Sequence, residues 1–536
     1  MLHVGCGAGG LAAGYRPRNP AARLLGIEND PTLLDQASRS FDAVAAVDIE
    51  SNPVPFELPE GLDCLVYDGI LEQLGDPWRI VAAQSEALTS DGVIVMSLPN
   101  PGFWQTLERA LHGQPDGTWL TPAAAFTPEM VMRHLERIGL IPCDVMESQV
   151  SRPLASPFLD AMAPALQSLG IEPEGFAKRA SAARLVWRVR KQPRQRLFLS
   201  GSMLDPVGGV SHVRVVFPMQ ALATDPSVIT EIKDSIDSVP LHDDTPRIFI
   251  LHRPALVGEH GRNLVQTLST NGHLVITEFD DHPDFFPMMQ RGGALSFAGV
   301  HALQTSTTAL AGVLRKYNPE VAVFPNAIPS LPEIRNFADS RTITVFFGAL
   351  NREGDWETLM PVINEVIALA GDRLRFQVVH DKGFFDALQS PHKAFTPTCD
   401  YDAYLRLLGG CEVCFMPLSD TAFNRAKSDL KFIEAGACRV MSLASPVVYA
   451  ASVEHGRTGL LFNNPDELRT NLLRILALPE NARSIADNAR DHVAKHRMLA
   501  YQVAPRIAWY RSLWERREEL FAAQRERVRA FYEKAA

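Results

Sequence analysis

Two lysines and a glutamate in the last third of the chain have the types and spacing of an anion-binding site. Lys427, Lys431 and Glu434 occur in FNRAKSDLKFIEAGACRV, which predicts a loop followed by a helix over 428 to 437. Lysines four positions apart on one helix repel each other, so the pattern indicates a compensating anion. The amino end of the helix adds a partial positive charge, and Ser428 is predicted to cap it.

A second candidate site lies at the start of the sequence, where the glycine-rich turn MLHVGCGAGG follows a short apolar strand. The turn fits G-x-G-x-x-G, a pattern that lets a backbone approach a cofactor closely, through Gly5, Gly7 and Gly10. Glu28 ends the next strand, where a carboxylate can accept hydrogen bonds from ribose hydroxyls. Asp48 follows a third strand, and Asp68 follows a fourth. NAD enzymes and methyltransferases share the turn, so it does not by itself decide between them.

Three further polar clusters leave a functional and a structural interpretation open. His380 and Asp381 follow a predicted strand and could flank a nucleobase or simply end that strand. The loop EFDDHPDFF could be read as a metal site, but clustered acids in a loop more often cap helices or face water. We therefore expect no metal, and an acceptor-side role for Asp281. A glycine-rich loop could contact phosphate or acceptor, or serve only as a turn into a helix, through Gly208, Gly209, His212 and Arg214.

Residues 2 to 190 resemble the class I S-adenosylmethionine-dependent methyltransferases. The resemblance is carried by the glycine turn, by YDGILEQLGDP around the fourth strand, by the fifth strand GVIVMSLPN and by the helix FTPEMVMRHLERIGL. It implies that Gly5, Gly7 and Gly9 approach the methionine part of S-adenosylmethionine and that Glu28 binds the ribose. It also implies an adenine contact from Asp48 and Ile49, with Asp68 at the same site.

Two departures from the methyltransferase pattern keep an alternative open. The family usually has a helix and a longer first strand before the glycine turn, whereas this sequence has three strand residues after Met1. Relatives often carry His and Arg just before the FT helix, where this sequence reads LTPAAAFT. We expect either a start further upstream or a weakened site. The alternative to a working methyltransferase is a non-catalytic docking module.

Residues 197 to 500 resemble the GT-B glycosyltransferases of the retaining, metal-independent kind, close to bacterial surface-polysaccharide enzymes. The matching stretches are VFPNAI, FFGALNREGDW, FNRAKSDLKFIEAGACRVMSLASPVVY and EHGRTGLLF. The resemblance implies that Glu434, the second glutamate of an E-x7-E motif, binds the donor ribose. The first glutamate falls at Ala426, so its contact is missing or comes from Asn424 or Asp429.

The same resemblance implies a nucleotide-sugar donor and a glycan or lipid-linked acceptor. Without a metal, cations and backbone N–H groups must meet the negative charge of the leaving nucleoside diphosphate. The donor site is predicted to comprise Gly348, Arg352, His380, Asn424, Lys427, Ser428, Lys431 and Glu434. The acceptor or cleft residues are predicted to be Gly208, Gly209, His212, Arg214 and Asp281. The open alternative is a non-catalytic carbohydrate-binding protein.

These candidate sites require parallel sheets to position them. The 536 residues are too many for one hydrophobic core and predict about three units. Apolar strand patterns alternate with helical patterns, which predicts an α/β fold with one methyltransferase-like Rossmann domain and two Rossmann-like domains in GT-B arrangement. The predicted segments are 1–190, a linker at 191–196, 197–335, 336–505 and a helical tail at 506–536.

Composition and charge narrow the class of protein further. The net charge of -10 argues against a nucleic-acid binder. No apolar run is long enough to span a bilayer, and no leader pattern is present, so we expect a cytoplasmic protein. Seven scattered cysteines fit reduced thiols better than a disulfide framework. The amphipathic tail is expected to pack on the cleft domains, with peripheral membrane association as the alternative. The oligomeric state is not predicted.

Overall fold

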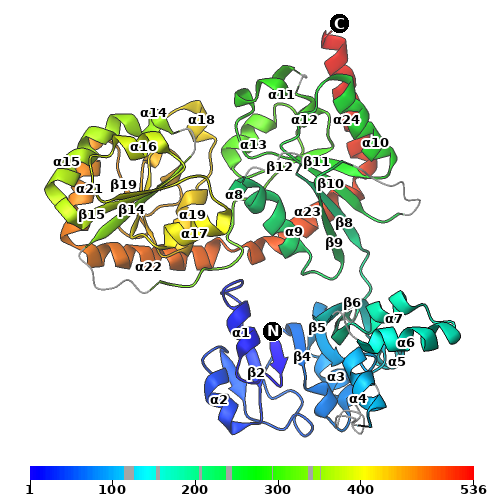
Figure 1. Cartoon of the computed structure of the whole chain (residues 1–536). Helices are drawn as coiled ribbons and strands as arrows, with labels where there is room; N and C mark the ends of the chain where they lie inside the picture. The colour runs from blue at the N-terminus through cyan, green and yellow to red at the C-terminus, as the bar shows by residue number, and fades with distance from the viewer. Residues whose placement is uncertain are drawn as a thin grey trace. The chain divides into compact units, whose positions relative to one another are not determined.

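The computed structural model describes residues 1–113, 126–151, 157–203, 208–236, 244–291, 294–335, 342–349 and 352–535. The alanines of LTPAAAFT lie outside these residues. The described chain forms two compact units. The first comprises 1–16 and 22–195, and the second comprises 17–21 and 196–536. Three sheets, one in the first unit and two in the second, confirm the predicted α/β class (Figure 1).

The first unit is built on a seven-stranded sheet of order β3-β2-β1-β4-β5-β7-β6. All neighbours pair in parallel except β7, which is antiparallel to both β5 and β6. The strands are β1 (Leu2–Val4), β2 (Leu25–Ile27), β3 (Ala43–Ala45), β4 (Leu62–Asp68), β5 (Leu88–Pro99), β6 (Ile141–Val150) and β7 (Ala182–Arg190). After β1 the chain adds β2 and β3 on one side of the sheet, whereas after β4 it adds β5 on the other side. The point where the strand order reverses therefore lies between β1 and β4.

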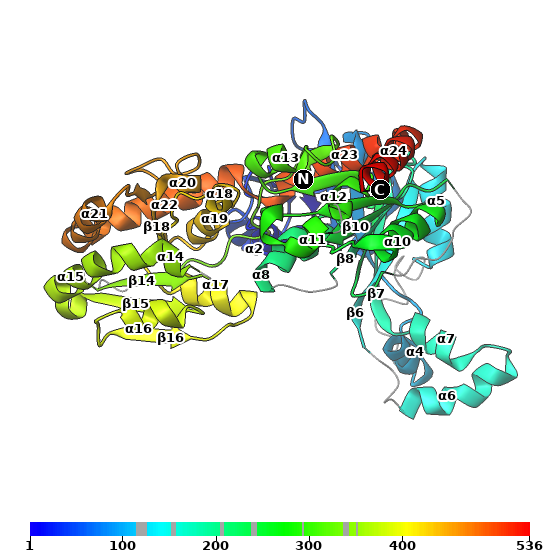
Figure 2. The ribbon, with the colours of Figure 1, turned by 90° about the horizontal axis from the view of Figure 1, so that it is seen from above.

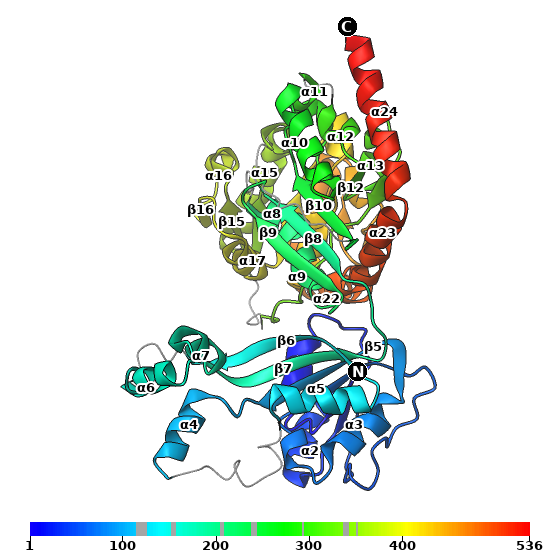
Figure 3. The same ribbon diagram turned by 90° about the vertical axis from the view of Figure 1, so that its right-hand side faces the viewer.

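The helices of the first unit include two that lie at one end of the β6–β7 pair, α6 and α7 (Figures 2 and 3). The helices are α1 (Gly10–Tyr15), α2 (Pro31–Ala37), the 3-10 turn η1 (Leu71–Gln73), α3 (Pro77–Ser85), α4 (Trp104–Leu111), α5 (Pro128–Arg137), α6 (Pro157–Ser168) and α7 (Pro173–Arg179). Asp30, Asp76 and Thr127 cap three of them, each followed by proline at the start of the helix.

The first half of the second unit is a parallel six-stranded sheet of order β13-β12-β11-β10-β8-β9. Its strands are β8 (Leu197–Ser202), β9 (Val228–Lys233), β10 (Arg247–His252), β11 (Leu274–Glu278), β12 (Ala302–Thr305) and β13 (Val321–Val323). Its helices are α8 (Gly208–Ser211), the π-helical turn η5 (His212–Val216), α9 (Phe217–Leu222), α10 (Gly258–Thr270), η6 (Pro283–Phe285), α11 (Pro287–Arg291), α12 (Leu295–Ala298) and α13 (Thr308–Leu314).

The apolar run HVRVVF within 208–222 predicts a strand by its residue types, whereas the glycine-rich loop before it left a turn into a helix open. The segment is helical throughout. The reason is topological, because β8 and β9 are parallel neighbours and the chain between them must cross over the sheet. The predicted strand belongs instead to 228–233, whose VITEIK pattern pairs with β8.

The second half is another parallel sheet, of order β16-β15-β14-β17-β18-β19. Its strands are β14 (Ile343–Gly348), β15 (Leu374–Val379), β16 (Lys393–Thr396), β17 (Val413–Met416), β18 (Met441–Ala444) and β19 (Leu460–Leu461). Its helices are α14 (Glu353–Trp356), η7 (Glu357–Leu359), α15 (Met360–Ala370), η8 (Gly371–Arg373), α16 (Lys382–Ala387), α17 (Tyr401–Gly409), α18 (Ala422–Arg425), α19 (Leu430–Ala437), α20 (Pro446–Tyr449), α21 (Pro465–Ala477) and α22 (Pro479–His496).

The end of the chain returns to the first half of this unit (Figure 1). After η9 (Leu499–Gln502), α23 (Val503–Glu515) and α24 (Arg517–Ala535) follow. Ile507, Tyr510 and Leu513 of α23 are buried in one cluster with residues of β8 and β10. Among the described helices, none is long and apolar enough to cross a membrane.

Three buried histidines in the first half predict acid sensitivity. Burial lowers the pKa of His252, His273 and His301 to about 4. In the unfolded chain histidine titrates near ~6.5, so the unfolded state gains protons first as the pH falls. Stability is therefore fully present above that pH and is lost as the pH falls toward 4. We expect a loss of about 1 kcal/mol per histidine between pH 7 and 5.5.

Thermal unfolding between pH 7 and 5.5 measures this loss, and His301 provides the matched variant. Its Nδ1 accepts a hydrogen bond from the Val275 N–H at 2.9 Å, which an asparagine oxygen can replace without titrating. His301→Asn should therefore flatten the pH dependence. An unchanged slope in His301→Asn would contradict the assignment of the loss to this histidine.

Candidate functional site

A large pocket in the second unit is lined by both of its sheets. Its volume is about 980 Å³. The lining residues follow the carboxyl ends of strands in each half, including Arg253 after β10, Asp281 after β11, Gly348 at the end of β14 and His380 after β15. Ligands bind at this edge of open parallel sheets. The pocket is therefore where a substrate of this unit is expected.

Helix α19 contributes a partly buried lysine and a buried glutamate to the pocket. Lys431 Nζ donates a hydrogen bond to the Gly348 carbonyl oxygen, and Glu434 is 3% exposed. Glu434 Oε1 accepts from the Tyr401 hydroxyl at 2.8 Å, and Oε2 accepts from the Tyr404 hydroxyl at 3.4 Å. Burial lowers the pKa of Lys431 and raises that of Glu434, while their mutual attraction opposes both shifts. An anion entering the pocket would meet a desolvated cation here.

Gly348 fits this position because any side chain would collide with its neighbours. A Cβ there would lie 2.6 Å from Phe346 Cε1 and 2.9 Å from Tyr404 Cε2. The glycine thereby lets the end of β14 approach α17 and α19. The sequence predicted Gly348 as a site residue, whereas Tyr401 and Tyr404 were missed. Their only signal is a spacing of three on a helix, which brings both hydroxyls to one carboxylate.

Arg352 lies at the same edge and is held by two partners. Its Nη1 donates to Asp355 Oδ2 at 3.1 Å and to Asn424 Oδ1 at 3.0 Å. Asn424 in turn donates to Asp355 Oδ1 at 2.8 Å and is 4% exposed. Arg352 lines the pocket, whereas Asn424 lies behind it and orients it.

The proposed substitutes for the missing glutamate at Ala426 are both engaged elsewhere. Asp429 forms an ion pair with Arg497, with Oδ1 2.8 Å from Nη2, and accepts a hydrogen bond from Ser452. Neither Asp429 nor Asn424 is among the residues that line the pocket. Ala426 itself is buried against a cluster of first-half residues.

Two expectations for the start of α19 are wrong. Ser428 does not cap the helix, because the N-cap is Asp429, and the Ser428 hydroxyl instead accepts from Asn326 Nδ2 at 2.8 Å. Lys427 precedes the helix, so it does not share a helical face with Lys431. Both lysines still line the pocket, although they do not lie four positions apart on one helix.

The first half supplies a glycine packed directly on α17. A Cβ at Gly209 would lie 2.9 Å from Tyr401 Cδ2, and the His212 ring stacks on the Tyr401 ring at 5.9 Å. Gly209 lines the pocket, whereas Gly208 begins α8 and His212 lies beside the pocket without lining it. Gly209 and His212 therefore help to position Tyr401.

Arg214, a predicted acceptor or cleft residue, lines the pocket with a largely buried side chain. It is 2% exposed and forms two hydrogen bonds with Glu278, at 2.9 and 3.1 Å. Its Nη1 also donates to Phe324 O and to Asn326 Oδ1. Four of its five donors are thus occupied. Arg214 therefore lines the pocket with a guanidinium group whose position is fixed by hydrogen bonds to the protein.

The acids of EFDDHPDFF form ion pairs in the structure. Glu278 pairs with Arg214, Asp280 Oδ1 lies 2.7 Å from Arg253 Nε, and Asp281 Oδ1 lies 3.4 Å from Lys427 Nζ. Within the described residues, no group of three potential ligand side chains surrounds a metal position. Arg253 lines the pocket and was not predicted from the sequence, because its acidic partners follow the neighbouring strand β11.

His380 and Asp381 take separate roles after β15. His380 lines the pocket with a backbone φ of 77°, a conformation that non-glycine residues rarely adopt. Asp381 caps α16 by accepting from the Phe384 N–H at 2.8 Å, and it accepts from Trp356 Nε1. The strand-ending interpretation therefore holds for Asp381.

The candidate cofactor residues of the first unit meet at its switch point. Gly5 and Gly7 follow β1 with φ values of 67° and 54°, and Gly9 has a φ of 87°. Glu28 Oε2 accepts from the Gly7 N–H at 2.7 Å, and Oε1 accepts from the Asn29 and Asp30 N–H groups at 3.0 Å each. The end of β2 and the glycine turn are thereby held together.

The remaining residues of this set follow the other strand ends. Asp48, after β3, is exposed and accepts from the Glu50 N–H at 3.0 Å. Asp68, at the end of β4, is also exposed, whereas Ile49 is buried in the core of the unit. Cys6 is buried beside Gly26, and its pKa is raised to about 11 by burial.

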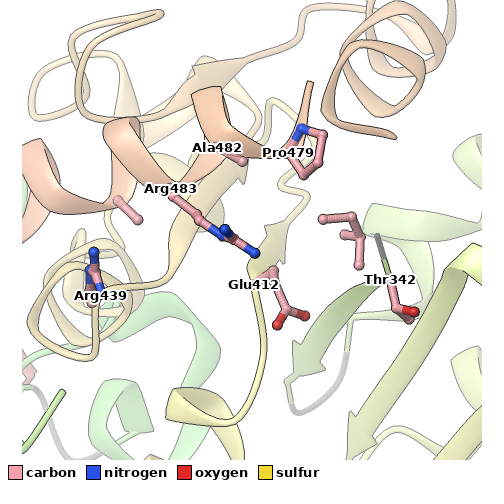
Figure 4. A pocket seen from close by; sticks show the side chains of 8 residues that line it. Thr342, Glu412, Arg439, Pro479, Ala482 and Arg483 are labelled. Atoms are coloured by element: carbon pink, nitrogen blue, oxygen red, sulfur yellow. The ribbon is translucent and has the colours of Figure 1, made fainter. Parts of the chain in front are cut away.

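A smaller pocket lies at the opposite edge of the second-half sheet (Figure 4). It is lined by residues near the amino ends of β14, β17 and β18, including Thr342, Glu412 and Arg439. Its volume of about 10 Å³ is enough for about one water molecule. Its size and its position at the amino edge make it a poor candidate for a substrate site.

Comparison with known proteins gives one family-level match and several partial similarities. Residues 363–508 match a family model described as glycosyl transferase-like. An uncharacterized 37.1 kDa protein in transposon TN4556 of Streptomyces fradiae is 29% identical over 109 residues, which are 20% of this chain and 31% of that protein. A trans-aconitate 2-methyltransferase of Enterobacter sp. (strain 638) is 26% identical over 100 residues, 19% of this chain and 39% of that protein. The chain thus spans less than two fifths of either relative.

Similar solved structures include HepE of Anabaena in complex with UDP-glucose. It is 13% identical, with a TM-score of 0.43, and the match covers 59% of this chain and 100% of that one. A sucrose-phosphate synthase from Thermosynechococcus elongatus is 15% identical, with a TM-score of 0.43 and coverage of 61% and 100%.

Proposed function

We propose that the second unit is a glycosyltransferase that moves a sugar from a nucleotide-sugar donor to a glycan or lipid-linked acceptor in cell-surface polysaccharide synthesis. The observation that carries this proposal is the convergence of Arg352, Lys427 and Lys431 on one pocket with the buried Glu434. Lys427, Lys431 and Glu434 also fall within the residues that match the glycosyl transferase-like family model.

The chemistry follows from the charges of these side chains. As the bond between sugar and phosphate breaks, the leaving nucleoside diphosphate gains negative charge, and three cations at the pocket wall stabilise it. Such an arrangement needs no metal. Glu434 still has acceptor positions beyond its two tyrosine hydrogen bonds, so it can bind ribose hydroxyls. The acceptor would enter from the first half, and the sugar would retain its anomeric configuration.

For the first unit we propose S-adenosylmethionine-dependent methyl transfer, with a non-catalytic docking role as the alternative. A Cβ at Gly7 would meet nothing within 4 Å among the described residues, so the turn is open to a ligand. Glu28 accepts three hydrogen bonds from described backbone groups, and a carboxylate offers about four positions, so one remains for a ribose hydroxyl. S-adenosylmethionine would supply the methyl group there.

Ligand-induced stabilisation tests both proposals on the full chain. A ligand at ~100 times its dissociation constant should stabilise its unit by about 2.7 kcal/mol. We expect a thermal shift with one of UDP, GDP, dTDP or CMP, and with S-adenosylhomocysteine a second shift that Glu28→Ala abolishes. A nucleotide shift alone would leave a glycosyltransferase with a docking module. The absence of any nucleotide shift would favour the carbohydrate-binding alternative.

A further inference from the structure

One ion pair joins the two halves of the second unit across the proposed donor pocket. Asp281 follows β11 in the first half, and its Oδ1 lies 3.4 Å from the Nζ of Lys427 in the second half. The side chains are 15% and 21% exposed, and both line the pocket. The pair is therefore partly shielded from solvent, where salt screens charges less than at an open surface.

Asp281 and Lys427 each have a second neighbour that fixes their positions. Asp281 Oδ2 lies 3.6 Å from Arg253 Nη2, while Arg253 Nε is bound to Asp280 at 2.7 Å. Lys427 Nζ lies 3.9 Å from the centre of the Phe423 ring, in a cation–π contact. Asp281 can therefore keep the cation Arg253 nearby after losing Lys427, whereas Lys427 has one described carboxylate partner.

A diphosphate in this pocket would compete with Asp281 for the same ammonium group. Phosphate oxygens and a carboxylate bind an ammonium through the same charge-assisted hydrogen bonds, and a nucleoside diphosphate carries more negative charge than one carboxylate. If Lys427 binds the diphosphate, Asp281 either loses its partner or stays close to a like charge. Either outcome costs binding free energy that a neutral side chain would not cost.

We infer that Asp281 competes with the nucleoside diphosphate for Lys427, and that this competition speeds release of the nucleotide after sugar transfer. The inference rests on the proposed function, because it requires the diphosphate to occupy this pocket. Asp281 then acts as a positioning residue. As the nucleotide leaves, Asp281 forms its ion pair with Lys427 again, as in the structure.

The test measures the affinity and the dissociation rate of UDP, GDP and dTDP with the full chain. Asp281→Asn keeps the shape of the side chain and removes its charge. For the nucleotide that binds, we expect the dissociation constant to fall by about 3- to 10-fold, mainly through slower dissociation. Loss of a merely structural contact would weaken binding instead, so the sign of the change is decisive.

Two further variants separate this competition from a general effect of charge. In Lys427→Met, the added Asp281→Asn change should alter affinity less than twofold, because the competition acts through Lys427. Asp284→Asn removes the same charge three residues away, on a side chain that is 69% exposed, and should leave affinity unchanged. Weaker or unchanged binding in Asp281→Asn, or equal tightening in the Lys427→Met background, would overturn the inference. If the unaltered chain binds none of the three nucleotides, the premise that a nucleoside diphosphate occupies this pocket fails, and the proposed function is then decided by the test with CMP.

Discussion

Lys431→Met is expected to lower the affinity for the nucleoside diphosphate by about 10- to 100-fold, the range for losing a hydrogen bond between charged groups. The change removes a partly buried cation whose pKa is lowered by desolvation before the ligand arrives. It also leaves Glu434 without the positive charge that counteracts the effect of burial on its pKa. Glu434 should then take up a proton more readily and bind ribose hydroxyls less well. Calorimetric titration of the full chain with the nucleotide that stabilises it measures the loss of affinity.

The matched control for this prediction is a lysine in the same half that lies outside the pocket. Lys382 begins α16, is 58% exposed and pairs with Asp386. Lys382→Met should leave nucleotide affinity unchanged. Equal losses in Lys382→Met and Lys431→Met, or full affinity in a folded Lys431→Met protein, would refute a specific role for Lys431.

Glu278→Gln is expected to destabilise the second unit by about 3 to 5 kcal/mol, the usual cost of leaving one partner of a buried ion pair uncompensated. The side chains of Arg214 and Glu278 are 1% and 0% exposed, so water cannot replace the lost carboxylate. The amide nitrogen that replaces one carboxylate oxygen cannot accept the hydrogen bonds that Arg214, or Arg214 together with Gln304 Nε2, donates to that oxygen. Thermal unfolding of the variant, followed by near-ultraviolet circular dichroism, measures the change.

An exposed ion pair supplies the comparison for this buried one. Arg425 and Asp420 are bound to each other at 2.6 Å but are 65% and 61% exposed. Asp420→Asn should cost less than ~1 kcal/mol, because water solvates the remaining charge. Similar losses of stability in Asp420→Asn and Glu278→Gln would show that burial of the Arg214–Glu278 pair is not what makes it important.

The strands of the fold could be predicted wherever the sequence pattern is set by burial in a parallel sheet. LFLSG, RIFILH and HLVITEF are continuous apolar runs, and β8, β10 and β11 occupy them. The segment 208–222 could not be assigned in this way. Its valines and phenylalanine have high β propensity, but crossing from β8 to β9 requires a helix, and tertiary context overrides local preference. The following VITEIK, which is rich in β-branched residues, held the signal for β9.

Site residues could be predicted where they lie together in one short sequence motif. They could not be predicted where elements far apart in the sequence bring them together. Lys427, Lys431 and Glu434 lie within eight positions of each other, so one motif revealed all three. Arg253 follows β10, and Tyr401 and Tyr404 lie on α17, so all three reach the pocket from outside this motif. The spacing of the two tyrosines is the only local signal for them. Arg214 was predicted from its glycine-rich neighbours and does line the pocket, but the local sequence did not reveal that Glu278 from β11 binds its guanidinium.

The central claim is most directly tested by measuring nucleoside diphosphate release from a panel of nucleotide sugars incubated with the full chain. We expect release from donors of one nucleotide class, and its loss in Glu434→Gln, which keeps the shape of the side chain but removes the charge that binds the ribose. No release from any donor, or equal release by Glu434→Gln, would contradict the assignment of this pocket as a nucleotide-sugar site.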